Sequence, residues 1–224
     1  MIPIRDQMPT RRVAVVNYLI IIANIIAFVF QLQAGPNQEA LVYQYALIPA
    51  DFIGGVSLGD IANIFTSMFM HAGLAHIGGN MLYLWIFGDN VEDSMGAGKY
   101  ILFYLVGGVI ASLTHILTNP GSQIPTVGAS GAIAAVLGAY LVLYPQSRVL
   151  TLIPLGFFTR LTLIPAGFVL GFWFVLQLFN GVLSLGGPAV GGTAFWAHIG
   201  GFVSGVVLAK LFASRRRPET IMPW

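Results

Sequence analysis

The chain has 224 residues, of which 57% are hydrophobic and 8% are charged, and its formal net charge is +2. Soluble domains carry about 25% charged residues, so this composition excludes a water-soluble fold and predicts an all-α polytopic membrane protein. The absence of cysteine excludes disulfides, a thiolate nucleophile and cysteine-ligated metals. The basic residues are few and scattered, apart from a run at 215–217, so we expect no nucleic-acid partner.

Six apolar stretches are candidates for membrane-spanning helices, which need about 20 residues each. The first stretch follows Arg11 and Arg12, as in a signal peptide, but it lacks a small-residue cleavage site, so we expect it to be retained. The second and fourth stretches are short, and the fourth ends at Pro145. The predicted spans are residues 13–32, 76–91, 100–117, 130–144, 161–182 and 194–213.

The positions of lysine and arginine indicate how these spans are oriented. Neither residue type occurs between positions 13 and 98, nor in the loops 118–129 and 183–193. With six spans and a cytoplasmic N-terminus, all ten basic residues fall on or near the cytoplasmic side, as the positive-inside rule requires. We therefore expect both termini in the cytoplasm, with a segment 1–12, a six-span domain 13–213 and a basic tail 214–224.

Two of the external loops have an unusual composition. The loop 33–75 is rich in large apolar residues and its only charged residues are Glu39, Asp51 and Asp60. This composition favours a position in the membrane interface or against the bundle over that of an ordinary solvated loop. The loop 183–193 is glycine-rich and neutral, as expected of a mobile cap.

Ser130 lies in the sequence Gly128-Ala129-Ser130-Gly131, at the start of the short fourth span. A serine at a helix start lies beside backbone N–H groups without helical partners, which suits a nucleophile; the alternative is a plain small-residue helix start. Ser130 lies 18 residues before Arg148, so a continuous helix places it about 27 Å from the cytoplasmic edge.

His198 lies near the start of the sixth predicted span, 17 residues before Arg215. The same rise per residue gives it a depth of about 26 Å, which matches that of Ser130. A lone membrane histidine is more often a structural hydrogen-bonding residue, but the matching depth favours a Ser130–His198 pair. Gly201 and Gly205 repeat the small-residue spacing that allows two membrane helices to approach closely.

His76 and Asn80 are four residues apart and therefore share one helical face. Both side chains can donate hydrogen bonds, so with the backbone N–H of Ser130 they could form an oxyanion hole. A metal site that includes His71 and His76 is the competing interpretation, but the spans offer no third ligand near them. We assign the remaining histidine, His115, to packing or an interface and not to catalysis.

The span centres contain no carboxylate that could orient His198, because all eight acidic residues lie in loops or at span ends. A Ser-His-Asp triad is therefore not expected. The residues favour a Ser-His dyad in which the histidine removes the serine proton and later protonates the leaving amine.

These residues resemble the motifs of the rhomboid intramembrane serine proteases, and the resemblance extends over most of the chain. The order, the spacing and the six-span layout are similar to the basic bacterial form of the family. The matching motifs are His71-x4-His76-x3-Asn80, Glu92-x3-Gly96, Gly128-x-Ser130-Gly131 and Ala197-His198-x-Gly200-x3-Ser204.

The resemblance implies a role for each matching residue. Ser130 would be the nucleophile, His198 the general base and acid, and His76 and Asn80 the oxyanion donors. Two further residues, Glu92 and Gly96, would hold the cytoplasmic helix ends together.

The resemblance also implies a substrate class and a location. Members of the family cleave transmembrane segments of other proteins near their outer ends, without a metal or cofactor. Substrate enters sideways past the fifth span and under the cap loop. The expected location is the lipid bilayer of a bacterial-type plasma membrane.

The sequence departs from the family pattern in two places. Ala62-Asn63 stands where Trp-Arg is common in the first loop, which puts the anchoring of that loop to lipid headgroups in doubt. Ala134 stands where an aromatic residue often stacks on the catalytic histidine. Another group must then hold the ring of His198, and Trp196 and Phe202 are the candidates.

Two other functions compete with a protease. A catalytically inactive rhomboid-like protein that binds membrane clients is one, but such relatives usually lose the serine or the histidine, and this chain has both. A small transporter or channel is the other, and it would require charged residues within the span centres, which this chain does not have.

Overall fold

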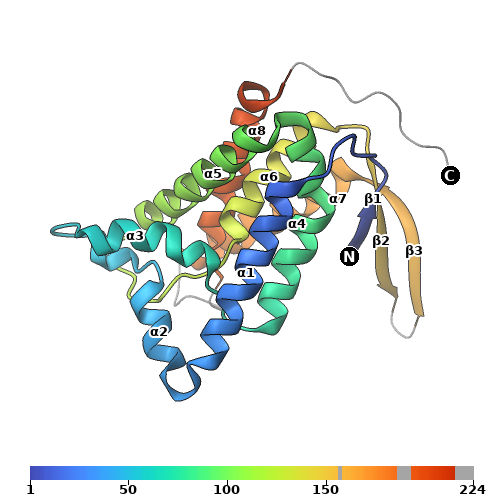
Figure 1. Ribbon diagram of the computed structural model, residues 1–224. Coiled ribbons are helices and arrows are strands. Elements are labelled where there is room, and N and C mark those ends of the chain that lie inside the picture. The colour runs from blue at the N-terminus through green and yellow to red at the C-terminus, as the bar shows by residue number, and fades with distance from the viewer. Residues whose placement is uncertain (156–157, 186–192, 215–224) are drawn as a thin grey trace.

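The computed structural model describes residues 1–155, 158–185 and 193–214, and every statement below refers to these residues. Most of them are helical, and six of the helices form a bundle (Figure 1). Most of the expected cap loop and nearly all of the expected basic tail lie outside the described residues. The six helices are α1 (Val15–Gln33), α4 (Leu74–Met95), α5 (Ala97–Thr118), α6 (Ser130–Leu143), α7 (Ala166–Ser184) and α8 (Phe195–Phe212).

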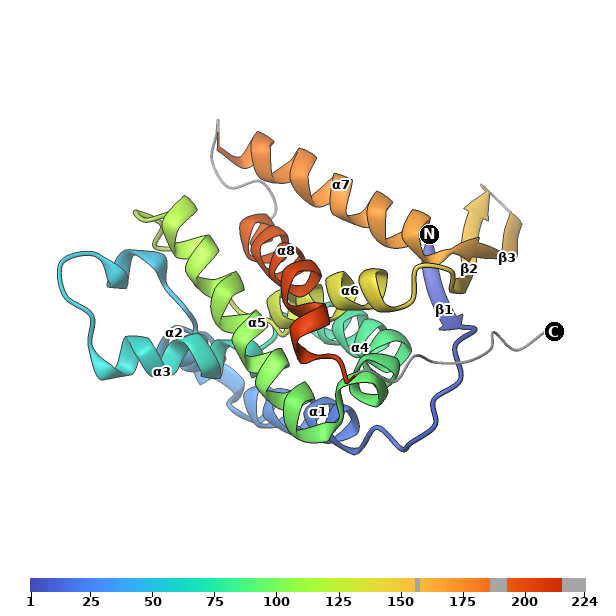
Figure 2. The same cartoon turned by 90° about the horizontal axis from the view of Figure 1, so that it is seen from above.

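Helix α6 lies at the centre of the bundle, with α4, α5, α7 and α8 around it (Figure 2). Residues 131–140, which form most of this helix, are all buried. Alanines and glycines predominate among them, so the neighbouring helices can approach the backbone closely. The residue at the start of α6, Ser130, is thereby placed inside the bundle.

Four of the six helices, α1, α5, α7 and α8, are long and apolar enough to cross a membrane, judged by length and composition. Helix α6 is apolar but has only 14 residues. Helix α4 carries Asp89, Glu92 and Asp93 near its C-terminal end. The helical bundle is thus a membrane-type fold in which four helices have the character of complete spans.

The expectation of an all-α protein is confirmed only in part: most of the described residues are helical, but three strands form an antiparallel sheet beside the bundle (Figure 1). The strands are β1 (Ile2–Asp6), β2 (Arg148–Leu155) and β3 (Phe158–Pro165), in the order β1-β2-β3. Ile2 pairs with Leu152, and Thr151 pairs with Thr162. Residues 2–6 of the N-terminal segment therefore form one edge of the sheet.

The fifth predicted span began too early. Residues 161–165 belong to β3, and α7 begins only at Ala166. The stretch 158–165 contains Phe158, Thr159, Thr162 and Ile164, and such aromatic and β-branched residues favour an extended strand. Pro165 immediately precedes α7. Proline has no backbone N–H, and a residue at the start of a helix needs none because no helical acceptor is available to it.

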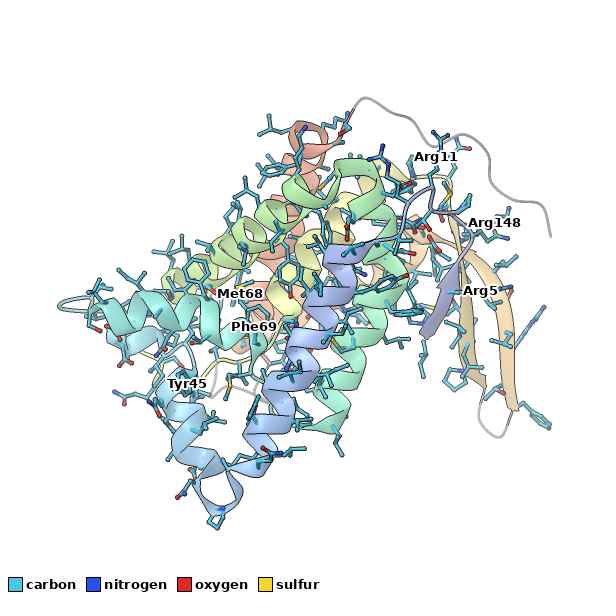
Figure 3. All side chains as sticks on the ribbon, viewed as in Figure 1. Arg5, Arg11, Tyr45, Met68, Phe69 and Arg148 are labelled. Atoms are coloured by element: carbon cyan, nitrogen blue, oxygen red, sulfur yellow. The ribbon has the colours of Figure 1, made fainter. Side chains whose placement is uncertain are left out.

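The sheet is joined to the bundle by a polar contact between Asp6 of β1 and Tyr140 of α6. The Tyr140 hydroxyl donates to the Asp6 carboxylate and also lies 2.7 Å from the Ser147 hydroxyl. Burial raises the pKa of Asp6 to about 6, against the opposing effect of the hydrogen bond from Tyr140. Figure 3 shows Arg11 and Arg148 at the same end of the molecule.

Glu92 of α4 lies at the N-terminus of α1. Its carboxylate accepts the backbone N–H of Val16 at 3.1 Å and of Asn17 at 2.7 Å. The residue before α1, Ala14, has no capping side chain, so Glu92 satisfies first-turn donors from a neighbouring helix. Gly96, with φ of +82°, forms the turn from α4 to α5. Glu92 and Gly96 thus lie where the ends of α1, α4 and α5 meet.

The segment between α1 and α4 contains two further helices, α2 (Gln38–Tyr45) and α3 (Leu58–Thr66), to one side of the bundle (Figure 1). Ser57 and Asp60 form a capping box that begins α3. Several large apolar side chains of α3 are exposed, among them Leu58 and Ile61.

Candidate active site

Ser130 and His198 lie next to each other although they are 68 residues apart in the chain. Ser130 is the first residue of α6, and His198 lies in the first turn of α8. The Ser130 hydroxyl Oγ is 2.7 Å from Nε2 of His198, which is hydrogen-bonding distance. The structure therefore brings together the two side chains that the sequence placed at equal depth.

Glycines of α8 allow this approach of α6 and α8. A β-carbon on Gly201 would overlap the carbonyl oxygen of Gly131, and it would lie 3.2 Å from Cβ of Ala134. A β-carbon on Gly205 would overlap the carbonyl oxygen of Ala135. The backbones of the two helices are thus in direct contact, in the small-residue manner of membrane helices.

The ring of His198 is held from α7, and not by either of the two aromatic residues suggested by the sequence. Nδ1 of His198 lies 2.8 Å from the amide oxygen Oε1 of Gln177. The Trp173 ring lies on the same histidine, with 5.8 Å between ring centroids. Trp196 instead donates its Nε1–H to the carbonyl of Gly181.

Phe202 packs on Trp173 and Phe174, at centroid distances of 6.1 and 4.5 Å. Sequence reasoning overlooked Gln177, although polar residues within spans are functional candidates by default. Trp173 and Gln177 are four residues apart and therefore share one face of the fifth predicted span. That spacing could have identified the pair.

His76 lies on the other side of Ser130, against the turn that precedes α6. A β-carbon on Gly128 would be 2.8 Å from both Cε1 and Nε2 of His76 and 3.5 Å from Oγ of Ser130. Gly128 has a φ of +130°, which also disfavours any other residue. Because Gly128 has no side chain, Nε2 of His76 can occupy the space next to Ser130 that a β-carbon would fill.

The hydrogen bond at Nδ1 of His76 determines which nitrogen of the ring carries the proton. The backbone N–H of Ala72 points at Nδ1 of His76 at 3.4 Å, and an N–H group can only donate. Nδ1 is then the acceptor, and the ring proton is on Nε2, the atom beside Gly128. His76 thus presents a donor toward Ser130. His71 packs edge-on against His76, with 5.1 Å between ring centroids.

A cavity of about 600 Å³ opens in front of these residues. It is lined by residues of five helices, α4, α5, α6, α7 and α8, and of the turn before α6, among them His76, Asn80, Ser130 and His198. The Asn80 amide nitrogen Nδ2 is buried and has no hydrogen-bond partner in the described part of the chain. A buried donor without a partner costs free energy, so a ligand oxygen is the group it could bind.

His115 of α5 also lines this cavity, rather than serving only in packing. Its Nδ1 lies 3.3 Å from the amide nitrogen of Asn119.

Residues 1–155, 158–185 and 193–214 contain no group of three or more histidine, aspartate or glutamate side chains placed to hold a metal ion.

The arrangement has the chemical parts of a serine hydrolase site. A hydroxyl contacts an imidazole nitrogen, and the second imidazole nitrogen faces a hydrogen-bond acceptor. Two further donors, on His76 and Asn80, lie beside the same cavity. Such a set can generate an alkoxide nucleophile and stabilise negative charge on a carbonyl oxygen.

Comparison with known proteins identifies related sequences. The model of the Rhomboid domain family matches residues 58–215. The rhomboid protease GluP of Bacillus subtilis (strain 168) is 35% identical over 101 residues, which are 45% of this chain and 19% of GluP. RHOMBOID-like protein 1 of Arabidopsis thaliana is 34% identical over 159 residues, or 70% of this chain and 36% of the relative.

A mitochondrial relative is also similar. The presenilin-associated rhomboid-like protein of Bos taurus is 30% identical over 183 residues, 77% of this chain and 45% of the relative. In all three comparisons, the match spans less than half of the relative's length. The family model covers well over half of this chain and includes Ser130, His198, His76 and Asn80. The chain belongs to the rhomboid family.

Proposed function

We propose that this chain is an intramembrane serine endopeptidase that hydrolyses peptide bonds in or near transmembrane segments of other membrane proteins. The contact between Ser130 Oγ and His198 Nε2, at 2.7 Å, carries the proposal. An unreacted serine is a weak nucleophile, and an adjacent imidazole is what activates it. Family membership and the similarity to a protein named a rhomboid protease support the same reaction.

The first half of the reaction forms an acyl-enzyme. His198 Nε2 takes the proton of Ser130 Oγ while the oxygen attacks the scissile carbonyl carbon. Negative charge then develops on the carbonyl oxygen, where Nε2–H of His76, Nδ2–H of Asn80 and the backbone N–H of Ser130 stabilise it. The carbon–nitrogen bond breaks, and the histidine proton passes to the leaving amine.

The second half releases the acyl group. A water molecule gives a proton to His198 and attacks the ester carbonyl, and the serine oxygen leaves with the proton from the histidine. Every proton is thus exchanged through one imidazole ring. The reaction needs no metal ion or cofactor.

The place of the site in the bilayer follows from the six-span arrangement that the positive-inside rule favours. In this arrangement both termini lie in the cytoplasm, and α4 and the short α6 count as spans together with the four long apolar helices. Ser130 then lies in the outer half of the membrane. A substrate helix reaches it sideways, past α7.

The experiment uses the full chain in liposomes with a transmembrane reporter protein. We expect cleavage by the wild type, none by Ser130→Ala or His198→Ala, and unchanged cleavage by Ser214→Ala, a serine at the opposite end of the fold whose hydroxyl donates to the Met95 carbonyl. Cleavage by Ser130→Ala would exclude the serine mechanism. Reporter binding without cleavage by the wild type would favour a rhomboid-like protein that only binds its clients.

A further inference from the structure

Two side chains of α7 contact the histidine of the site. The amide oxygen of Gln177 lies 2.8 Å from Nδ1 of His198, on the opposite side of the ring from Ser130. Trp173, one helical turn earlier, lies on the ring at a centroid distance of 5.8 Å and an interplanar angle of 35°. The three residues Ser130, His198 and Gln177 therefore form a continuous line of hydrogen-bonding groups across α6, α8 and α7.

The direction of the Gln177 amide follows from its second contact. Its nitrogen Nε2 lies 3.4 Å from the backbone carbonyl of Trp173 and can only donate to it. The reverse orientation would place two oxygens against each other at that carbonyl. The amide oxygen is thus directed at His198, where it accepts a hydrogen bond from Nδ1–H.

A proton on Nδ1 leaves Nε2 of His198 with a free lone pair. This is the tautomer that can accept the Ser130 proton, whereas a ring with its proton on Nε2 cannot act as the base. When the ring becomes doubly protonated during the reaction, the Gln177 oxygen still accepts the hydrogen bond from Nδ1–H and stabilises the new charge.

We propose that Gln177 is a positioning residue for the dyad, which selects the reactive tautomer of His198, and that Trp173 sets the plane of the ring. The proposal rests on the proposed function. It gives a neutral amide the place that a carboxylate occupies in a Ser-His-Asp triad, in a membrane interior where a charged group is costly. It also supplies an orienting group for His198 in a chain that has Ala134, and not an aromatic residue, four positions after Ser130.

The location of Gln177 makes the dyad depend on α7. Helix α7 lies at the edge of the bundle (Figure 2), and only Ala166, Val169, Leu170 and Gly181 are buried in it. Most of its large apolar side chains face outward, so few protein contacts hold it in place. The orienting group is therefore carried by a peripheral helix and not by the central α6.

The kinetic test replaces the acceptor while keeping the size of the side chain. Gln177→Leu should lower kcat for a transmembrane reporter roughly 10- to 100-fold, the value of a hydrogen bond to a group that becomes charged, with KM nearly unchanged. Gln177→Glu should restore much of the rate and shift the acidic limb of the kcat/KM profile to higher pH, because a carboxylate makes the histidine more basic. An unchanged acidic limb in Gln177→Glu would contradict the proposal.

Asn180→Leu is the matched control. Asn180 is another amide of α7 that donates to the carbonyl four residues before it, Leu176, at 2.8 Å, as Gln177 does to that of Trp173. Its amide has no contact with His198 among the described interactions, so kcat, KM and the pH profile should stay at wild-type values. Equal losses in Gln177→Leu and Asn180→Leu would mean that amides of α7 only stabilise the helix.

A measurement without turnover separates this proposal from the proposed function. Nitrogen-15 NMR of labelled histidine distinguishes the two tautomers, and His198→Ala identifies the signal. We expect a proton on Nδ1 in the wild type and in Ser130→Ala, and a mixture of tautomers in Gln177→Leu. A proton on Nε2 in the wild type overturns the positioning role even if cleavage is observed. If the protein cleaves no reporter but His198 carries its proton on Nδ1, the proposed protease function is contradicted while the role of Gln177 in selecting the tautomer stands.

Discussion

Gly205 of α8 lies against the backbone carbonyl of Ala135 of α6 with no room for a β-carbon between them. The contact is one turn of α8 beyond the similar contact of Gly201 with Gly131, which adjoins the dyad. The distance between the two helices at these glycines therefore determines whether Ser130 and His198 can reach each other.

Gly205→Ala should separate α6 from α8 and lower both stability and activity. Overpacking of this kind costs typically about 1–3 kcal/mol, and here the opposing atoms are backbone, which cannot rotate away. Thermal unfolding in detergent and reporter cleavage measure the two effects. Gly171→Ala is the control, because a β-carbon on Gly171 of α7 meets no atom within 4 Å. Equal stability of the two variants would contradict the close contact.

Asn80→Ala should reduce the cleavage rate about 10²–10³-fold without destabilising the fold. The Asn80 amide nitrogen has no partner within the described segments, so its removal breaks no structural hydrogen bond. The rate of reporter cleavage and the melting temperature are measured together. A large fall in melting temperature with a proportionate loss of activity would indicate a structural residue and not an oxyanion donor.

A disulfide between α7 and α8 should restrict substrate entry while leaving the dyad intact. A β-carbon on Gly181 would lie 3.5 Å from Cβ of Phe195, within the range of disulfides, and the chain has no other cysteine. In the oxidised Gly181→Cys, Phe195→Cys variant, we expect cleavage of a transmembrane reporter to fall about tenfold. Labelling of Ser130 by a small fluorophosphonate should remain.

Reduction of the same variant is the control, and it should restore cleavage to the wild-type rate. If oxidation leaves reporter cleavage unchanged, α7 need not move away from α8 for substrate to enter. Loss of both cleavage and labelling on oxidation would instead mean that the crosslink distorts the dyad.

The free energy of unfolding should fall as pH rises through 6, because the carboxylate of Asp6 is buried and its ionisation is costly. Burial raises the folded-state pKa of Asp6 to about 6, above the value of about 3.9 expected for an unfolded chain. The folded protein therefore binds this proton more tightly. The stabilisation, at most about 3 kcal/mol, is complete below about pH 4 and is lost as pH rises through 6.

Asp6→Asn keeps an acceptor for the Tyr140 hydroxyl but does not titrate. Asp89 is a second carboxylate close enough to interact with Asp6, so the measurement is the difference between wild type and variant. We expect the melting temperature of the wild type to fall relative to that of Asp6→Asn between pH 4.5 and 7. Parallel curves would show that Asp6 does not titrate in this range.

Much of the helical fold could be predicted from the sequence, because long apolar stretches bounded by polar residues determine where such helices lie. The start of α7 could not, since Leu161, Leu163 and Ile164 extend the apolar run of the helix toward the N-terminus, and only the neighbouring threonines favour a strand. The pairing of β1 with β2 was also missed. It joins residues about 145 positions apart, and the short segment before Arg11 gives no signal of its partner.

The candidate site was predicted in part. Glycine spacing and equal depth suffice to pair Ser130 with His198, because both follow from helical geometry. The residue that orients His198 could not be inferred from the motifs, because it comes from a third helix whose rotation the sequence leaves open. Ala134 indicated only that the group must come from elsewhere in the fold.

The location of a fluorophosphonate adduct is the most direct test of the Ser130–His198 dyad. Peptide mapping of the labelled wild-type protein should find the adduct on Ser130 and on no other serine, and His198→Ala should abolish it. An adduct on a different serine, or full labelling of Ser130 in His198→Ala, would contradict the account.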